Sequence, residues 1–332
     1  MPRLPRILKI GLVAPFEGRY RYVGYDAIYA ARMAVSEVNT AGGLGDGWYL
    51  DLVAYDDRAD PAMARAAAHN LASDPDVVAA IGHYRQEGSE AVGGIYANAG
   101  IPWVVTGAWL TPSMTLTWQL APAPENVADT MLEAASEPRT ASMTTWGKCP
   151  LTPILASHIR SVTRYFSDPE KVYPSSNVLS TLSPVAAAER LCAWRDQGWQ
   201  GMLVGDWNLA VAEFASVAGP AISGTIFVTP YPLPHDVAAG SWVSDYLSVG
   251  PHVPRPGPYA LPTYEAVYVI VDALSSTIHS GAPPTRAHLA ETLPGVHHKG
   301  LLGTVAWDER GFWQDAPLYL YRWREDGTVE RF

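Results

Sequence analysis

Residues 79–92, AAIGHYRQEGSEAV, combine an apolar run that ends at Gly82 with a cluster of hydrogen-bonding and charged side chains, His83 through Glu87. The run VVAAI at 77–81 has the length and composition of a buried strand, and residues 87–98 have helical character. A polar cluster between a strand and a helix is where α/β proteins place ligand-binding groups. This stretch therefore predicts a strand–loop–helix unit with a binding role.

The same alternation extends outward along the chain. In the first part we expect strands at 7–13, 50–57, 77–81 and 101–105, and helices at 25–39, 61–72 and 87–98. Later strands are expected at 141–146, 177–183, 201–207 and 225–232, with helices at 154–166, 186–198, 209–218 and 264–278. Residues 254–262, PRPGPYALP, are typical of a loop, and 303–313 and 316–323 read as two β segments joined by a turn. Short strands separated by helices indicate an α/β fold with parallel sheets.

Length and charge narrow the class of protein. A chain of 332 residues favours two domains of roughly 150 residues each. The net charge of −10, from 23 basic and 33 acidic residues, argues against nucleic acid as a partner. No apolar run approaches the ~18 residues that a spanning helix needs, so direct membrane insertion is not expected.

Cellular location stays open on the sequence alone. Cys149 and Cys192 are the only cysteines, and either one bridge or two buried thiols is compatible with them. Residues 1–13 lack the long apolar segment of an export signal, because Lys9 and Gly11 interrupt the run. Either an export signal has been removed or the protein stays inside the cell.

Polar loops follow four of the expected strands. They comprise Glu17–Tyr22, Asp56–Asp60, His83–Glu87 and Thr106–Trp109. Because the carboxyl ends of parallel strands share one edge of a sheet, these loops outline half of a ligand site.

The clustered aspartates Asp56, Asp57 and Asp60 invite comparison with a metal site. Their spacing lacks the glycine and the distal glutamate of a calcium loop, and aspartate before a helix caps free N–H groups. The histidines form no H-x-x-x-H pair, and His297 and His298 are expected in a loop. We expect no metal and no cofactor.

Enzyme motifs are also lacking. The sequence contains neither a G-x-S-x-G elbow nor a G-x-x-x-x-G-K-[ST] phosphate loop, and GGLGDG follows a helix instead of a strand. We expect no catalytic residue and no enzyme activity.

Several segments together resemble one known family. They are IGLVAPFEGRY, AVSEVNTAGGLGDGWYLDLVAYDDRADP, VVAAIGH, IPWVV, AGPAISGTIFVTPYP, PTYEAVYVIVDAL and GTVAWDERGFW. In this order the chain resembles the type I periplasmic solute-binding proteins, specifically the Leu/Ile/Val-binding protein-like branched-chain amino acid and amide receptors of ABC importers.

The resemblance implies two Rossmann-like lobes joined by three crossover strands. Lobe 1 would comprise 1–115 and 232–310, and lobe 2 would comprise 116–231 and 311–332, with crossings near 115, 231 and 311. The stretch from Thr106 to Asp206 is short for the family, so the second lobe is expected to be shortened.

The resemblance also implies the site residues. By position, Tyr84, Arg85 and Gln86 line the wall of the first lobe together with Gly107, Ala108 and Trp109. Tyr22 covers them from the first loop, and Asp206 or Trp207 faces them from the second lobe. The family's usual serine is replaced by Gln86, its usual threonine falls near Trp109, and a tyrosine it often offers falls near Leu182.

The substituted side chains suggest a ligand class. Arg85 is able to grip a carboxylate, and Trp109, Trp146 and Trp207 are able to sandwich a planar or apolar body. The alternative for Arg85 is a surface ion pair with Glu87 or Glu90, and His83 is expected to be structural.

We therefore expect an extracytoplasmic receptor of an ABC importer that captures a small amino acid-like, amide or aromatic-acid ligand by hinge closure. Its partners would be this small molecule and the permease subunits in the membrane. A cytoplasmic sensor of the same fold is the alternative. An α/β hydrolase and a binder of a partner protein also remain compatible with the sequence.

Overall fold

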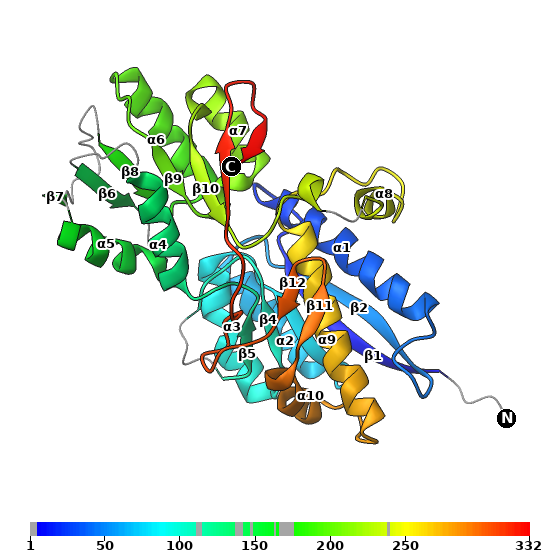
Figure 1. Ribbon diagram of the computed structural model, residues 1–332. Helices are drawn as coiled ribbons and strands as arrows, with labels where there is room; N and C mark the ends of the chain where they lie inside the picture. The colour runs from blue at the N-terminus through cyan, green and yellow to red at the C-terminus, as the bar shows by residue number, and fades with distance from the viewer. Residues whose placement is uncertain are drawn as a thin grey trace. The chain divides into compact units, whose positions relative to one another are not determined.

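The computed structural model describes residues 5–110, 115–136, 142–146, 149–162, 164–165, 176–237 and 240–332 (Figure 1). The chain forms two compact units, here called unit 1 (Met1–Ala121 and Pro232–Ala316) and unit 2 (Pro122–Tyr231 and Pro317–Phe332). It passes between them three times, after Ala121, Tyr231 and Ala316. The expected crossings near 115 and 311 lie a few residues before the first and third of these points.

Unit 1 is built on a five-stranded parallel sheet in the order β2-β1-β3-β4-β5. Its strands are β1 (Arg6–Ala14), β2 (Trp48–Asp56), β3 (Val77–Gly82), β4 (Trp103–Val105) and β5 (Thr117–Gln119). β3 is buried at every position, as expected of a strand in the middle of a parallel sheet. The first four strands match the strands expected from the sequence to within a few residues.

Helices cover both faces of this sheet. α1 (Arg21–Thr40) packs against α9 (Ala260–His279), and α2 (Pro61–Ser73) packs against α3 (Gln86–Ala99). Figure 1 shows the two pairs on opposite sides of the strands of unit 1. Two shorter helices, α8 (Trp242–Leu247) and α10 (Arg286–Thr292), complete unit 1.

Two helices begin earlier than the sequence predicted. α1 begins at Arg21 instead of 25, so Tyr22 lies in its first turn and not in a loop. α9 begins at Ala260, inside the proline-rich stretch that was expected to be a loop throughout. Proline is tolerated in the first turn of a helix because its missing N–H would have no intrahelical acceptor there, which is why Pro262 does not prevent this start.

Unit 2 is smaller and contains a seven-stranded sheet in the order β14-β13-β10-β9-β8-β6-β7. The strands are β6 (Ser142–Trp146), β7 (Arg164–Tyr165), β8 (Asn177–Ser180), β9 (Leu203–Gly205), β10 (Ile226–Thr229), β13 (Tyr319–Trp323) and β14 (Val329–Arg331). Helices α4 (Pro124–Ala135) and α5 (Leu151–Val162) pack together, as do α6 (Pro184–Asp196) and α7 (Ala212–Ala218).

The two β segments expected near the carboxyl terminus belong to different sheets. β12 (Gly303–Val305) pairs antiparallel with β11 (His298–Gly300) in unit 1, whereas β13 pairs antiparallel with β10 in unit 2. Cys149 and Cys192 are both free thiols, so no bridge joins them. Within the described residues, the helices are too short or too polar for any to span a bilayer.

Both units use the same order of parallel strands. β2-β1-β3-β4-β5 in unit 1 corresponds to β7-β6-β8-β9-β10 in unit 2, so the direction of winding reverses between β1 and β3 and between β6 and β8. In such open sheets the ligand crevice lies at the carboxyl ends of the strands at this reversal. Gly82 marks the point in unit 1, because its φ is +103° and a Cβ there would lie 2.0 Å from the Val13 carbonyl oxygen.

A partly buried set of polar contacts joins α1, α9 and β11 in unit 1. His298 places Nδ1 2.8 Å from an Asp272 oxygen and Nε2 3.2 Å from a Glu265 oxygen. The hydroxyls of Tyr264 and Tyr268 both donate to Glu37, at 2.6 and 2.7 Å. His298 is therefore not the loop residue that the sequence suggested, since it begins β11 and is 5% exposed.

A second, partly buried anchor is Arg286, at the amino end of α10. Its guanidinium donates to the carbonyls of Asp74 at 2.5 Å, Val77 at 2.7 Å and Ala99 at 3.1 Å. Ala99 is the last residue of α3, and Asp74 follows the last residue of α2. A cation at two helix carboxyl termini satisfies carbonyls that have no partner within the helix.

Replacing Arg286 with Met should lower the free energy of unfolding by about 2–3 kcal/mol, because several partly buried carbonyls lose a charged donor. Urea denaturation measures this change. The matched control is Arg65→Met on the exposed face of α2, which should stay within about 0.5 kcal/mol of the wild type. Equal effects of the two substitutions would contradict the anchoring role of Arg286.

The His298 network should make stability depend on pH. Burial alone would lower the pKa of His298, but hydrogen bonds and charges from Asp272 and Glu265 outweigh it and raise the pKa from 6.5 to about 9. A folded-state pKa that is raised gives stability that is fully present below pH 6.5 and is lost as the pH rises through about 9.

Between these pH values the wild type should lose on the order of 2 kcal/mol of unfolding free energy that His298→Gln does not lose. Urea denaturation of both proteins across this range gives the two curves. Parallel curves would show that the imidazolium contributes nothing.

Candidate functional site

His83, the residue after β3, supports the carboxyl edge of the unit 1 sheet from inside the protein. This side chain is fully buried, with Nδ1 3.0 Å from Asp57 Oδ2 and Nε2 2.9 Å from the Tyr96 hydroxyl. Ser89 also donates to the His83 carbonyl. The structural role expected for His83 is confirmed, because both ring nitrogens are engaged inside the protein.

The three aspartates after β2 serve local structure. Asp60 accepts from the N–H groups of Ala62 and Met63 and so caps α2. Asp56 accepts from the Phe16 N–H at 2.8 Å, which ties the loop after β1 to the end of β2. The expected capping is confirmed, and no group of three or more potential metal ligands occurs in the described part of the chain.

Four tyrosines line the carboxyl edge of unit 1. The Tyr22 ring lies 6.5 Å from the rings of both Tyr20 and Tyr259, and Tyr84 meets Tyr259 edge to face at 5.8 Å. Burial raises the pKa of Tyr84, so its hydroxyl stays neutral at ordinary pH. These four side chains come from the residue before α1, from α1 itself, from the loop after β3 and from the residue that precedes α9.

Arg85 adds the positive charge of this edge. Its guanidinium carbon lies 4.3 Å from the centre of the Tyr20 ring, a cation–π contact. No carboxylate of the described residues pairs with Arg85, and Glu90 instead accepts from the Gln86 amide at 2.7 Å. The ion pair of Arg85 with Glu87 or Glu90, considered as the alternative, does not form.

Tyr259 is held in place from α1. The Asp26 carboxylate accepts from the N–H groups of Gly257 at 2.9 Å and Tyr259 at 3.2 Å. Thr263 donates to the Tyr259 carbonyl, and its hydroxyl oxygen lies 2.7 Å from the Tyr84 hydroxyl. Tyr20 lies in the polar loop Glu17–Tyr22 expected at this edge but was not singled out, and Asp26 was missed. Tyr259 was missed because the stretch before α9 was expected to be only a loop.

The loop after β4 supplies Gly107, Ala108 and Trp109. Gly107 has a φ of +78°, and a Cβ there would come within 2.9 Å of the Tyr259 ring. Ala108 and Trp109 are buried in unit 1. The carboxamide of Gln86 donates to the Trp109 carbonyl at 2.6 Å and accepts from its N–H at 3.2 Å. Gln86 therefore has both polar atoms engaged with protein.

In unit 2 the expected residues lie at the ends of β6 and β9. Asp206 is 1% exposed and caps a short 3₁₀ helix, Trp207–Ala210, by accepting from the Asn208 N–H. The Trp207 ring is buried 6.0 Å from the Tyr231 ring. Trp146 is the last residue of β6, and its side chain lies outside the described part of the structure.

The same edge of unit 2 carries hydroxyls that sequence reasoning missed. Thr152, in the first turn of α5, lies 2.7 Å from Thr181, just after β8, measured between the two hydroxyl oxygens. Cys149 is close by, and burial followed by the Asp206 charge raises the pKa of its thiol. These groups offer neutral hydrogen-bonding partners.

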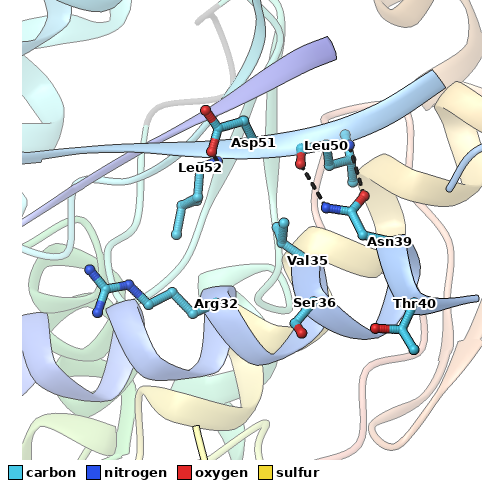
Figure 2. Close-up of a pocket in the computed structure, with 8 residues that line it drawn as sticks. All are labelled: Arg32, Val35, Ser36, Asn39, Thr40, Leu50, Asp51 and Leu52. Carbon is cyan, nitrogen blue, oxygen red and sulfur yellow. Dashed lines mark hydrogen bonds between the residues drawn. The ribbon is translucent and has the colours of Figure 1, made fainter. Parts of the chain in front are cut away.

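A surface groove lies elsewhere in unit 1, between α1 and β2 (Figure 2). Its lining comprises Arg32, Val35, Ser36, Asn39, Thr40, Leu50, Asp51 and Leu52. Asn39 bonds the N–H and the carbonyl of Leu50, at 3.0 and 2.8 Å, and so occupies part of the free edge of β2. This groove is at the amino end of β2 and contains none of the residues expected to bind ligand.

Gly107→Ala should lower the free energy of unfolding by about 1–3 kcal/mol, because the new methyl group strains the backbone and presses on Tyr259. Thermal and urea unfolding measure the loss. Gly94→Ala, on the exposed face of α3 with open space around it, is the control and should be neutral or stabilise by up to ~1 kcal/mol. A tolerated Gly107→Ala would show that the loop is not fixed against Tyr259.

Known proteins share both the sequence pattern and the fold. The family model described as periplasmic binding protein matches residues 7–147 and 174–328. The Leu/Ile/Val-binding protein homolog 2 of Brucella abortus is 23% identical over 98% of this chain and 93% of its own length. The leucine-, isoleucine-, valine-, threonine-, and alanine-binding protein of Pseudomonas aeruginosa is 22% identical over 97% and 91%.

Solved structures show the same fold. The branched-chain amino acid transporter substrate binding protein LivJ of Streptococcus pneumoniae, in complex with isoleucine, aligns with a TM-score of 0.81 at 18% identity, covering 98% of this chain and 99% of that one. A possible leucine/isoleucine/valine-binding protein of Rhodopirellula baltica aligns with a TM-score of 0.82 at 13% identity, covering 100% and 98%. The match of the family model over most of the chain, together with the fold, confirms the resemblance in the sequence: the chain belongs to the periplasmic binding protein family.

Proposed function

We propose that this protein is the extracytoplasmic solute-binding receptor of an ABC importer. It captures a small amino acid-like or organic-acid ligand between its two lobes by hinge closure, and the closed form is what the permease subunits recognise. Family membership supports the receptor role, and the names of the relatives support an amino acid-like ligand. No catalytic step is proposed.

The observation that carries the ligand class is the placement of Arg85. It lies in the short loop between β3 and α3, near the reversal point of the sheet, and stacks on Tyr20 while no described carboxylate pairs with it. A guanidinium in this position is suited to a carboxylate, to which it donates two parallel hydrogen bonds. Arg85 also precedes the first turn of α3, whose free N–H groups favour an anion.

The remaining side chains of the unit 1 edge suit the body of such a ligand. Tyr22, Tyr84 and Tyr259 present aromatic rings, and the hydroxyl of Tyr84 is already engaged with Thr263. We do not assign Gln86 to the ligand, because its carboxamide is hydrogen-bonded to the Trp109 backbone. We therefore favour a carboxylate with an aromatic or aliphatic body over a small amide.

Closure would follow from contacts made only when both lobes hold the ligand. Such contacts shift the population of open and closed forms without any further input of energy. The hydroxyls of Thr152 and Thr181, the buried Asp206 and the Trp207 ring are the groups that unit 2 offers at its strand ends.

Thermal-shift and calorimetric titrations with phenylacetate, L-leucine and acetamide test the proposed ligand class. At least one of the two carboxylates should raise the melting temperature of the wild type, since a ligand that binds the folded state stabilises it by mass action. Acetamide should have no effect.

Arg85→Gln should weaken binding of that carboxylate by about 30-fold, the loss of a charge-assisted bidentate contact. Arg19→Gln, which removes an exposed arginine from the loop after β1, serves as the matched control and should bind like the wild type. Binding of acetamide alone, or unchanged affinity in Arg85→Gln, would contradict the proposed ligand class.

A further inference from the structure

The loop that follows β4 is buried although it belongs to no helix or strand. Trp109 is 2% exposed and Leu110 is 1% exposed. A buried peptide group needs a hydrogen-bonding partner, and outside regular structure that partner has to be a side chain or water. The conformation of residues 106–110 therefore depends on whatever satisfies these two peptide groups.

Two glutamines satisfy them, one for each residue. Gln86 donates to the Trp109 carbonyl at 2.6 Å and accepts from the Trp109 N–H at 3.2 Å. Gln119 accepts from the Leu110 N–H at 2.6 Å and donates to the Leu110 carbonyl at 3.2 Å. Each carboxamide thus bonds both the backbone N–H and the backbone carbonyl of a single residue. Among neutral side chains, an amide is the group that offers a fixed N–H and a fixed carbonyl oxygen side by side.

Gln119 differs from Gln86 in the hydrogen bonds that its own backbone makes. It is the last residue of β5, and the chain leaves unit 1 shortly afterwards, at Ala121. The Gln119 N–H donates to the Gly311 carbonyl at 2.7 Å, and the Gln119 carbonyl accepts from the Trp313 N–H at 3.1 Å. Residues 311–313 lead to the third crossing, after Ala316.

One buried residue therefore joins its own stretch of chain to two others. Its side chain holds the loop that carries Gly107 and Trp109, and its backbone joins the stretches that lead to two of the three crossings. Gln119 is itself 2% exposed, so water does not compete for these bonds.

We propose that Gln119 is a positioning residue that couples the ligand-facing loop 106–110 to the crossing segments 117–121 and 311–313. The loop and these segments then move as one piece, and rotation about the crossings carries Gly107 and Trp109 without deforming their loop. We call the two hydrogen bonds between the Gln119 carboxamide and the Leu110 peptide groups the clasp. The coupling to ligand rests on the proposed receptor function, whereas the clasp is a property of the free protein.

The test compares three substitutions. Gln119→Met keeps the length of the side chain and removes both polar atoms. Gln119→Glu keeps the acceptor and loses the donor while the carboxyl is ionised, and regains one donor and one acceptor when it is protonated. Gln200→Glu makes the same chemical change at an exposed position of unit 2 and is the matched control.

Hydrogen exchange of the free protein gives the first readout. Gln119→Met should speed exchange of the Leu110 amide about tenfold, corrected for the intrinsic rate. Gln119→Glu should do the same at neutral pH and return to wild-type protection as the pH falls through the carboxyl pKa, which burial places above its usual value of about 4.3. Gln200→Glu should show neither effect.

Affinity for phenylacetate and L-leucine, measured by calorimetry, gives the second readout. Gln119→Met should weaken the carboxylate that binds about tenfold, and Gln119→Glu should recover the affinity at low pH along the same curve as the Leu110 protection. A general loss of stability in Gln119→Glu would not change with pH in the same way as the protection of the Leu110 amide. If Gln119→Met does not fold, Gln119→Glu at the two pH values carries the test.

Unchanged Leu110 protection in Gln119→Met, or no recovery in Gln119→Glu, would overturn the clasp. Lost protection with unchanged affinity would overturn the coupling to the ligand loop. If neither phenylacetate nor L-leucine binds the wild type, the proposed ligand class fails, and the exchange experiment still decides the clasp.

Discussion

The close approach of β3 to β1 at Gly82 is the constraint on which the rest of unit 1 depends. A Cβ at this position would lie 2.0 Å from the Val13 carbonyl oxygen, so the strand can end here only with glycine. The loops after β1 and β3 consequently leave the sheet side by side, and Arg85 from one is able to stack on Tyr20 from the other. Winding reverses between the same two strands, which is where open parallel sheets bind ligands.

Buried and partly buried polar side chains then fix the loops after β3 and β4 and the residues before α9. His83 and Asp57 support the loop after β3, Asp26 holds the residues before α9, and Gln86 with Gln119 holds the loop after β4. A fully satisfied buried network is rigid, because breaking any one bond leaves a polar group without water. The tyrosines and Arg85 are therefore presented by a preorganised wall, which lowers the entropic cost of binding a small ligand.

The sequence predicted the sheet of unit 1 well because its signal is local. Apolar runs, glycines and capping residues predict strands such as 77–81 and helices such as 61–72. The misses have tertiary causes: His298 lies in a strand because Glu265 and Asp272 on α9 pair with it.

The candidate site was predictable to the level of loops but not of atoms. Position along the chain pointed to Tyr84, Arg85 and Trp109, whose contact with a ligand stays a prediction. It could not show that Gln86 holds a peptide group, nor that Tyr259, far away in the sequence, joins the wall. Those facts depend on which loops meet in space, and no spacing rule in a single sequence contains them.

The proposed receptor anchors a carboxylate ligand on unit 1, beside the reversal point of its sheet. A crystal structure of the protein grown with phenylacetate or L-leucine is the decisive measurement. It should show density for a carboxylate within hydrogen-bonding distance of the Arg85 guanidinium and for the ligand body against Tyr22. Density in the groove between α1 and β2, or a ligand that leaves Arg85 stacked on Tyr20 without contacting it, would contradict this proposal.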